Sequence, residues 1–237
     1  GGLRVFCGTV FVFSDYMKHA IRMSALMKLP VTYVLTHDSI GVGEDGATHE
    51  PIEQLAGLRA MPNLQVYRPA DGKETAAAWL AALEEGLPTC LILTRQGLPQ
   101  YDRSGQEARH GAYILEDCEG TPDVILIASG SEVEQMMGAK EELKKDGIDA
   151  RVISMPCMEL FEMQDAEYRE SVLPSAVRAR VAMEAGCAMP WYRYTGLDGE
   201  VLGIDRFGAS APAAKLFEAF GFTADSAVAA AERVLKK

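Results

Sequence analysis

Short runs of β-branched and aromatic residues alternate with longer segments of helical apolar spacing along most of the chain. "VTYVLTH" (31–37) and "PTCLILTR" (88–95) have the length and composition of buried strands. Segments such as "SDYMKHAIRMSALMKLP" (14–30) carry apolar residues at intervals of three and four, as a helix with one buried face does. Because a helix between two strands returns the chain to the edge where it started, such strands pair in parallel. The alternation therefore predicts an α/β fold.

One interruption divides the alternation into two units. Residues 98–110 lose the apolar periodicity and are rich in charged and turn-forming residues, which is typical of a linker. We therefore expect units at 1–97 and 111–237, each an open, mostly parallel sheet flanked by helices. Further strands are expected at 64–70, 111–117, 123–131, 149–156, 178–186 and 200–204, and further helices at 51–61, 71–86, 131–147, 158–164, 166–174, 211–221 and 223–237.

The first residues have the character of a protein core. "GGLRVFCGTVFVF" lacks the polar residues usual at a natural terminus and proceeds at once into β-branched and aromatic residues. We therefore expect the chain to begin inside a domain whose missing strands leave an open sheet edge. Such an edge favours association, and we expect residues 1–13 to be displaced or mobile relative to an intact protein.

The composition excludes several classes of partner. A formal net charge of −11 over 237 residues repels nucleic acids and anionic membrane surfaces. The sequence has no basic patch with interleaved aromatic residues and no apolar run near the roughly 20 residues of a membrane helix. We therefore expect neither nucleic acid nor membrane as a partner. Five scattered cysteines without a pair at metal-ligand spacing indicate a reducing, cytoplasmic location.

The stretch "THDSIGVGEDGATHEP" (36–51) holds two of the four histidines, His37 and His49, on either side of a glycine-rich turn. Glycines let the backbone approach a ligand closely, and Asp45 offers an acceptor to a hydroxyl group. This mixture suits a polyhydroxylated phosphate, such as a sugar phosphate. A flexible turn with incidental histidines is the main alternative, and a zinc site is disfavoured because a third ligand at familiar spacing is missing.

Arg95 and two aromatic residues are further candidates. Arg95 ends an apolar strand, so its guanidinium needs water, a carboxylate or an anion such as phosphate. A structural ion pair is an equally good interpretation of Arg95 from the sequence alone. Phe13 and Tyr16 have helical spacing and could sandwich a flat heterocycle, although such a pair more often belongs to the core.

Together these residues resemble a known family. "FVFSDYMKHAIRMSALMKLPVTYVLTHDSIGVGEDGATHEPIEQLAGLRAMPN" closely resembles transketolases, thiamine-diphosphate enzymes that move two-carbon ketol units between sugar phosphates. "GEDGATHEPIEQLAGLR" is similar to the family's signature segment, and the likeness continues through "LILTRQGLP", "IASGSEVE" and "FGASAPAAKLFEAFGFT". The resemblance implies that 1–97 is the latter part of a pyrimidine-binding domain and 111–237 a C-terminal domain.

The resemblance also implies roles for positions that match the family's motifs. His37 and Arg95 match residues that bind the sugar phosphate group, and Asp45 matches a carboxylate that contacts a substrate hydroxyl. His49 matches the substrate-binding imidazole near the reacting carbonyl, so it is the expected catalytic residue on this chain.

For the cofactor, the resemblance implies thiamine diphosphate and Mg in the complete enzyme. Phe13 matches the aromatic residue that packs on the aminopyrimidine, and Tyr16 matches its companion ring. The GDG-type motif for the diphosphate and metal is absent, because "EDG" (44–46) belongs to the substrate loop, so no metal ligands are expected here. Val10 stands where relatives often have phenylalanine, and Ala47 replaces a proline.

The expected function is therefore that of the C-terminal part of a transketolase of the pentose phosphate pathway. The family's pyrimidine-protonating glutamate lies in a segment before Gly1, so we expect the chain alone to be inactive and to need a complementary N-terminal chain or a homodimer. One alternative is a non-catalytic assembly or binding module, which the four ligand-type residues disfavour. Another is a related thiamine-diphosphate synthase, such as one for dihydroxyacetone or deoxyxylulose phosphate.

Overall fold

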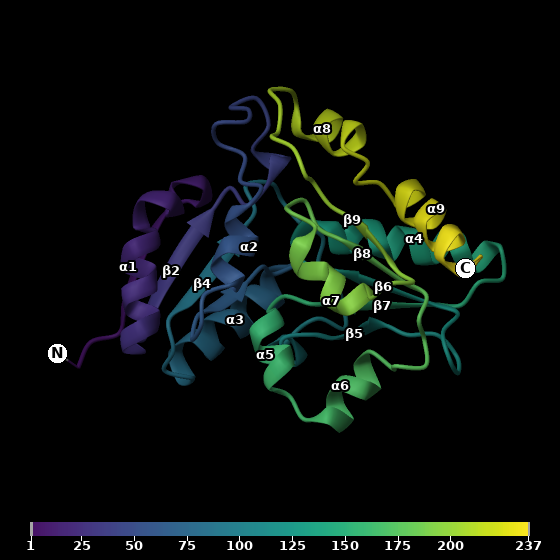
Figure 1. The fold of residues 1–237 in the computed structure, drawn as a ribbon, viewed down its shortest axis with the longest axis horizontal. Coiled ribbons are helices and arrows are strands. Elements are labelled where there is room, and N and C mark those ends of the chain that lie inside the picture. The colour runs from purple at the N-terminus through teal and green to yellow at the C-terminus, as the bar shows by residue number, and fades with distance from the viewer. Residues whose placement is uncertain (1, 237) are drawn as a thin grey trace.

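The computed structural model describes residues 2–236, which form two sheets flanked by helices (Figure 1). All four strands of the first sheet are parallel, in the order β1-β2-β4-β3. These strands are β1 (Val5–Val10), β2 (Val31–Thr36), β3 (Gln65–Tyr67) and β4 (Thr89–Leu93). The apolar residues of β2, β3 and β4 are mostly buried, as expected of parallel strands covered on both faces, whereas those of β1 are mostly exposed.

The second sheet has the order β5-β7-β6-β8-β9. It comprises β5 (Tyr113–Glu116), β6 (Val124–Ala128), β7 (Ala150–Ser154), β8 (Arg180–Met183) and β9 (Glu200–Leu202). Only β5 runs antiparallel to its neighbour, β7. The connection from β5 to β6 is too short to contain a helix that would return the chain, so β6 runs opposite to β5, and β7 is parallel to β6. The predicted class, α/β with two mostly parallel sheets, is confirmed.

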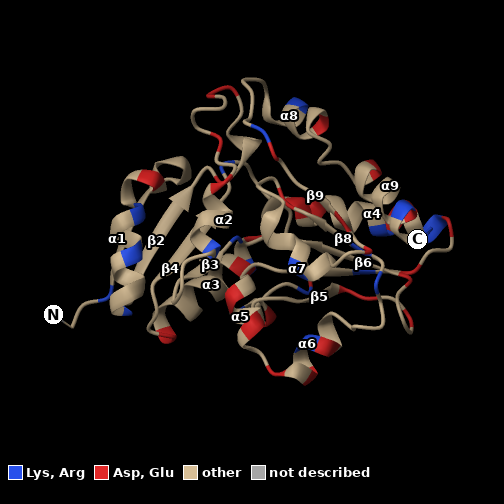
Figure 2. Ribbon diagram, in the orientation of Figure 1, with Lys and Arg blue, Asp and Glu red and all other residues tan. Residues whose placement is uncertain are grey.

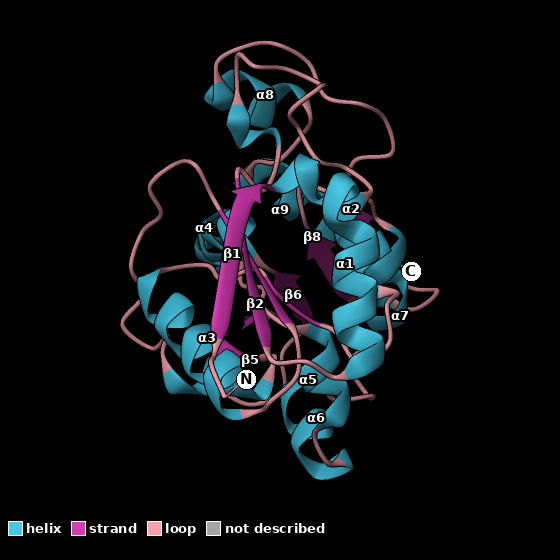
Figure 3. Ribbon diagram, turned by 90° about the vertical axis from the view of Figure 1, so that its left-hand side faces the viewer, coloured by secondary structure: helices cyan, strands magenta, loops and turns pink. Residues whose placement is uncertain are grey.

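Helices cover the sheets, and Figure 3 shows α1 and α3 on opposite faces of the first sheet. The first unit contains α1 (Ser14–Met27), α2 (Gln54–Arg59) and α3 (Gly72–Glu84). The second contains α4 (Val133–Lys145), α5 (Met158–Met163), α6 (Ala166–Val172), α7 (Tyr192–Thr195), α8 (Ala213–Ala219) and α9 (Ala224–Leu235). Short 3-10 turns are η1 (Phe11–Phe13), η2 (Ile40–Val42), η3 (Gln106–His110), η4 (Gly130–Glu132) and η5 (Met189–Trp191).

Local side-chain hydrogen bonds determine whether a helix begins where the sequence predicts. The expected start near Asp71 holds, because its carboxylate accepts a hydrogen bond from the Glu74 amide at 2.8 Å. The expected helix 51–61 is shorter, Gln54–Arg59, because the Gln54 side chain accepts the Ile52 amide at 3.0 Å and replaces a helical turn.

β1 lies at the open edge of the first sheet, which faces the viewer in Figure 3. Its register with β2 runs without a break from Val5↔Val31 to Val10↔Thr36, and Phe11 is fully buried. Backbone pairing with β2 holds residues 5–10 in the sheet although residues 5–8 are exposed, so the structure does not show the predicted displacement there, and the predicted mobility stays a prediction. Gly1 lies outside the described residues, and Phe6 stays 71% exposed on the edge strand.

Hydrophobic clusters connect the two units. One buried cluster joins Ile40 and Ala70 of the first unit to Tyr113 and Leu126 of the second. A smaller cluster joins Tyr67 of the first unit to Leu160 of α5 and to Cys157, which precedes that helix. Because packed interiors transmit displacement, the second unit can influence the strand ends of the first.

No helix among residues 2–236 is long and apolar enough to cross a membrane.

Candidate active site

Three neighbouring strands of the first sheet end at the same edge. Val10 is in register with Thr36, and Thr36 with Leu93, so β1, β2 and β4 finish side by side. Ligands of open parallel sheets bind outside these carboxyl ends. The residues that follow the three strands include the candidates Phe13, His37 and Arg95, which share this edge because the strands are parallel.

His37 has a constrained position directly after β2. Its φ of 64° lies in the left-handed region, which residues with a side chain seldom adopt. The hydroxyl of Thr36 is 2.9 Å from Nδ1 of His37, which fixes the orientation of the half-buried ring. A strained backbone of this kind persists only where the surrounding structure holds it.

The loop at 36–51 is held from two sides. Ser39 begins η2 by accepting the Gly41 amide, and a Cβ at Gly41 would lie only 2.5 Å from the Gln96 side chain. On the other side, the hydroxyl of Ser210 donates to the Glu44 carbonyl at 2.6 Å. Figure 1 shows this loop beside α8, far along the sequence. The second unit therefore braces the loop that carries the candidate histidines.

Arg95 reaches from the end of β4 to this loop. Its Nη1 donates to the Val42 carbonyl at 3.3 Å, and the residue is exposed. Within residues 2–236, no carboxylate forms an ion pair with Arg95. This finding disfavours the structural ion pair and leaves the charge open to an anion. Figure 2 shows acidic residues on the same loop, so a bound anion depends on nearby cations.

Phe13 connects the aromatic pair to the histidine loop. Its ring lies 5.4 Å from the His49 ring at an interplanar angle of 75°, and 6.1 Å from the Tyr16 ring. The Thr48 hydroxyl is 2.9 Å from Nδ1 of His49. The structure therefore brings Phe13, Tyr16 and His49 together. Tyr16 is 88% exposed. Asp45, on the same loop as His49, is also exposed.

Glu50, which follows His49, was not among the site residues predicted from the sequence. Glu50 is only 2% exposed, and its carboxylate lies so close to Gly208 that a side chain there would overlap it. Burial raises the pKa of Glu50 to about 7, although the Ala209 amide opposes the shift. The only sequence feature that distinguished Glu50 was its position between His49 and Pro51, and the composition of the loop suggested that its side chain would be exposed.

A buried group of charged residues was also missed. Burial would raise the pKa of Glu184, but Arg59 and Arg68 outweigh it and hold that pKa at about 2. Burial raises the pKa of Glu132, and Arg68 opposes this shift. These groups lie at the contact between the two units, next to the end of β2.

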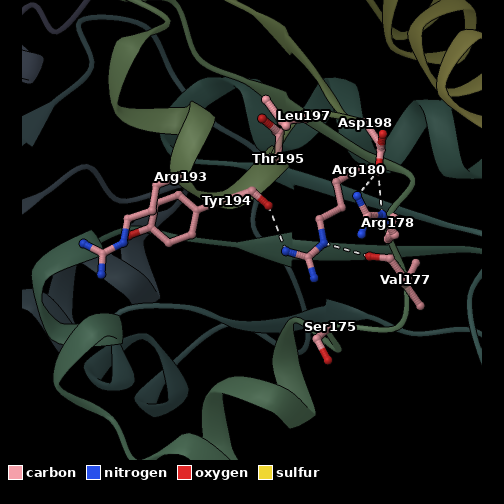
Figure 4. Close-up of a pocket in the computed structure, with 10 residues that line it drawn as sticks. Ser175, Val177, Arg178, Arg180, Arg193, Tyr194, Thr195, Leu197 and Asp198 are labelled. Carbon is pink, nitrogen blue, oxygen red and sulfur yellow. Dashed lines mark hydrogen bonds and ion pairs between the residues drawn. The ribbon is translucent and has the colours of Figure 1, made fainter.

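A hollow lined by three arginines in the second unit is a weaker candidate (Figure 4). Arg178 is paired with Asp198 and Arg193 with Glu162. Arg180 donates to neighbouring main-chain carbonyls, as the dashed lines in Figure 4 show. Because each guanidinium already has partners, this hollow offers an anion less than the loop beside Arg95 does.

Comparison with known proteins places the chain. Residues 1–100 match the family described as "Transketolase, pyrimidine binding domain", and residues 111–223 match "Transketolase-like TK C-terminal domain". The whole chain aligns at 56% identity with the transketolase of Bacillus subtilis. The chain belongs to the transketolase family. The resemblance inferred from the sequence is therefore confirmed.

This transketolase chain spans 36% of the length of the Bacillus subtilis protein. The structure of transketolase from Leishmania mexicana matches with a TM-score of 0.95 at 43% identity, covering 99% of this chain and 34% of that chain. A structure described as "Split gene transketolase, inactive beta4 tetramer" matches with a TM-score of 0.80 at 27% identity, covering 98% of this chain and 76% of that chain. That split-gene chain is much closer in length to this one.

The described residues fit one part of a transketolase cofactor better than the other. Phe13 and the exposed ring of Tyr16 present an aromatic surface suited to a flat pyrimidine. Within residues 2–236, no group of three or more His, Cys, Asp or Glu side chains could hold a metal ion.

Proposed function

We propose that this chain supplies the sugar-phosphate grip and the pyrimidine-contacting rings of a transketolase of the pentose phosphate pathway. The complete enzyme transfers a two-carbon ketol unit from a ketose phosphate to an aldose phosphate. The observation that carries the proposal is the meeting of three strand ends and the 36–51 loop at one edge, with Phe13 against His49 and Arg95 against the loop.

Arg95 and His37 bind the phosphate group in this proposal. Arg95 is anchored through one Nη1 contact, so its other N–H groups are available to phosphate oxygens. His37 is fixed through Nδ1, which orients the rest of the ring. Phosphate binding far from the reacting carbon orients the sugar, and that binding energy then lowers the barrier to reaction.

Asp45 and His49 act on the hydroxyl and carbonyl groups. The carboxylate of Asp45 accepts a hydrogen bond from a substrate hydroxyl. His49, held through Nδ1 by Thr48 and packed on Phe13, is the catalytic residue that stabilises the reacting oxygen. When bound, thiamine diphosphate supplies the carbon nucleophile, and Phe13 and Tyr16 contact its pyrimidine.

In the complete enzyme, the diphosphate and the Mg ion are held by polypeptide that this chain does not include, such as a complementary N-terminal chain, and the chain associates with that chain or as a homodimer. The domains are 1–97, the partial pyrimidine-binding domain, and 111–237, the C-terminal domain, joined by 98–110. Support for a complementary chain comes from the split-gene relative and from Phe6, exposed on the edge strand β1. We also propose a cytoplasmic location and sugar phosphates as the substrates.

The test is reconstitution of ketol transfer from xylulose 5-phosphate to ribose 5-phosphate with thiamine diphosphate and Mg. The purified chain alone should give no turnover. Addition of a transketolase N-terminal segment that carries the diphosphate motif should restore it, and His49→Ala should reduce the restored kcat by about 100-fold or more. Turnover by the chain alone, or full activity of the His49→Ala complex, would contradict the proposal.

A further inference from the structure

Arg68 and Asp38 form a buried ion pair between two strand ends. Asp38 follows His37, and Arg68 follows β3 directly. Oδ2 of Asp38 accepts from Nη2 of Arg68 at 2.7 Å and from Nε at 3.0 Å. Both side chains are fully or almost fully buried. The pair therefore lies one residue from the candidate phosphate-binding histidine.

The second unit holds the other side of this guanidinium. Nη1 of Arg68 donates to the Ser129 carbonyl at 2.8 Å and is paired with Glu132. The Gly130 amide donates to the Arg68 carbonyl at 3.0 Å. A Cβ at Gly130 would lie 2.7 Å from Cζ of Arg68, so only glycine allows this close approach.

The partners of Arg68 are themselves fixed. Glu132 accepts the Ala185 amide at 2.8 Å, which ties η4 to the residues after β8. Glu184 accepts the Ser129 hydroxyl at 2.5 Å and both Nη groups of Arg59 at 2.6 and 2.8 Å. These contacts make a polar frame at the contact between the two units, in which each charged side chain has an ion-pair partner.

From Asp38 the contacts continue into the 36–51 loop. Oδ1 of Asp38 accepts the Ser39 hydroxyl at 3.2 Å, and Ser39 caps η2 through the Gly41 amide. The carbonyl of Val42, at the end of η2, accepts a hydrogen bond from Nη1 of Arg95. These contacts thus run from the second unit through Arg68 and Asp38 into η2, whose Val42 carbonyl holds Arg95, while His37 is joined to Asp38 through the backbone.

We propose that Arg68, held by residues of the second unit, is a positioning residue for the phosphate-binding residues His37 and Arg95. By holding Asp38, it maintains the left-handed backbone of His37 and the start of the loop that anchors Arg95. A buried ion pair is weak evidence of stability, since desolvation offsets attraction, so positional control is the role that its geometry favours. The inference rests on the proposed function of His37 and Arg95 as phosphate ligands, and it gives the C-terminal domain a role in substrate binding.

The test compares Arg68→Lys with the matched control Arg151→Lys. Arg151 also donates two N–H groups to one carboxylate, that of Asp117, and one to a main-chain carbonyl, but it lies within the second unit. Lysine cannot reproduce either forked geometry. The readout is NMR of histidine-labelled 237-residue chain, whose four histidines give few signals, with ribose 5-phosphate as the probe.

Without ligand, Arg68→Lys should shift the backbone and ring signals of His37, whereas Arg151→Lys should leave them in place. With ligand, the Kd for ribose 5-phosphate should rise about tenfold in Arg68→Lys and stay constant in the control. If Arg68→Lys does not fold, Asp38→Asn takes its place as the test variant, because it keeps the shape of the side chain. It should give the same shift of the His37 signals and the same rise in Kd.

Unchanged His37 signals in both Arg68→Lys and Asp38→Asn would overturn the inference. Equal changes in His37 for Arg68→Lys and Arg151→Lys would also overturn it, because they would indicate general loosening. If the unaltered chain does not bind ribose 5-phosphate while Arg68→Lys still shifts His37, the proposed phosphate site fails and the positioning of His37 by Arg68 stands.

Discussion

The ring of Phe13 lies edge-on to the imidazole of His49, with the two centroids 5.4 Å apart. Phe13 comes from the turn after β1, and His49 from the loop after β2. This contact joins the proposed pyrimidine surface to the proposed catalytic residue. Edge-to-face pairs contribute about 0.5–1.5 kcal/mol beyond area burial, so the contact can orient the imidazole.

Phe13→Ala should destabilise the chain and move the His49 ring. Loss of a half-buried aromatic side chain should lower the free energy of unfolding by about 1–3 kcal/mol. Tyr16→Ala is the matched control, because Tyr16 is 88% exposed and its loss should change stability by less than about 0.5 kcal/mol. Urea unfolding measures both values, and equal losses would argue against the packing role of Phe13.

Glu50 should make stability fall as the pH rises. Its pKa is raised from 4.5 to about 7, so the native state binds its proton more tightly than the unfolded state does. The resulting stabilisation is complete below pH 4.5 and is lost as the pH rises through about 7. Glu50→Gln should therefore be more stable than the parent at pH 8, by about 1–3 kcal/mol, and similar to it at pH 4. Urea unfolding at the two pH values checks this, and a pH-independent difference would contradict it.

Glu184 should have the opposite dependence. Its pKa is lowered from 4.5 to about 2, so its contribution is present above pH 4.5 and is lost as the pH falls through about 2. Between pH 5 and pH 2, the parent should lose about 3 kcal/mol that Glu184→Gln does not lose. Acid unfolding curves of the two proteins give the difference. Parallel curves would show that Glu184 is not held ionised by Arg59 and Arg68.

Gly130→Ala should disturb the contact between the units. The new Cβ would lie 2.7 Å from Cζ of Arg68, and the backbone has φ of +57°. We expect a loss of about 2–4 kcal/mol. Gly147→Ala is the matched control, because φ is +75° there but no described atom lies within 4 Å of the added Cβ, so only backbone strain of about 1 kcal/mol is expected. Thermal or urea unfolding compares the pair, and equal losses would mean that Arg68 readily moves aside.

Local pattern was enough to predict the strand ends that form the site. The runs at 31–37 and 88–95 gave β2 and β4, and their parallel pairing follows from the helices between them. The strand at 111–117 was predicted, but its antiparallel direction was not, because that direction depends on the short connection to β6 rather than on the residues of β5.

Long-range partners explain the remaining misses. Arg68 lay within an expected strand, but its burial depends on Asp38 and on Glu132, which lies 64 residues away along the chain. Glu50 is buried by Gly208 of the second unit, so the loop sequence around it could not indicate a raised pKa. In both cases the partner is specified by tertiary packing, which propensity and periodicity do not encode.

The central claim is that the edge formed by β1, β2 and β4 binds a phosphorylated sugar. Titration of the histidine-labelled chain with ribose 5-phosphate tests it most directly. We predict that His37 and His49 shift together, that His19 and His110 do not, and that Arg95→Gln weakens binding about tenfold or more. Saturable binding that leaves His37 and His49 unmoved, or that Arg95→Gln does not weaken, would contradict the account.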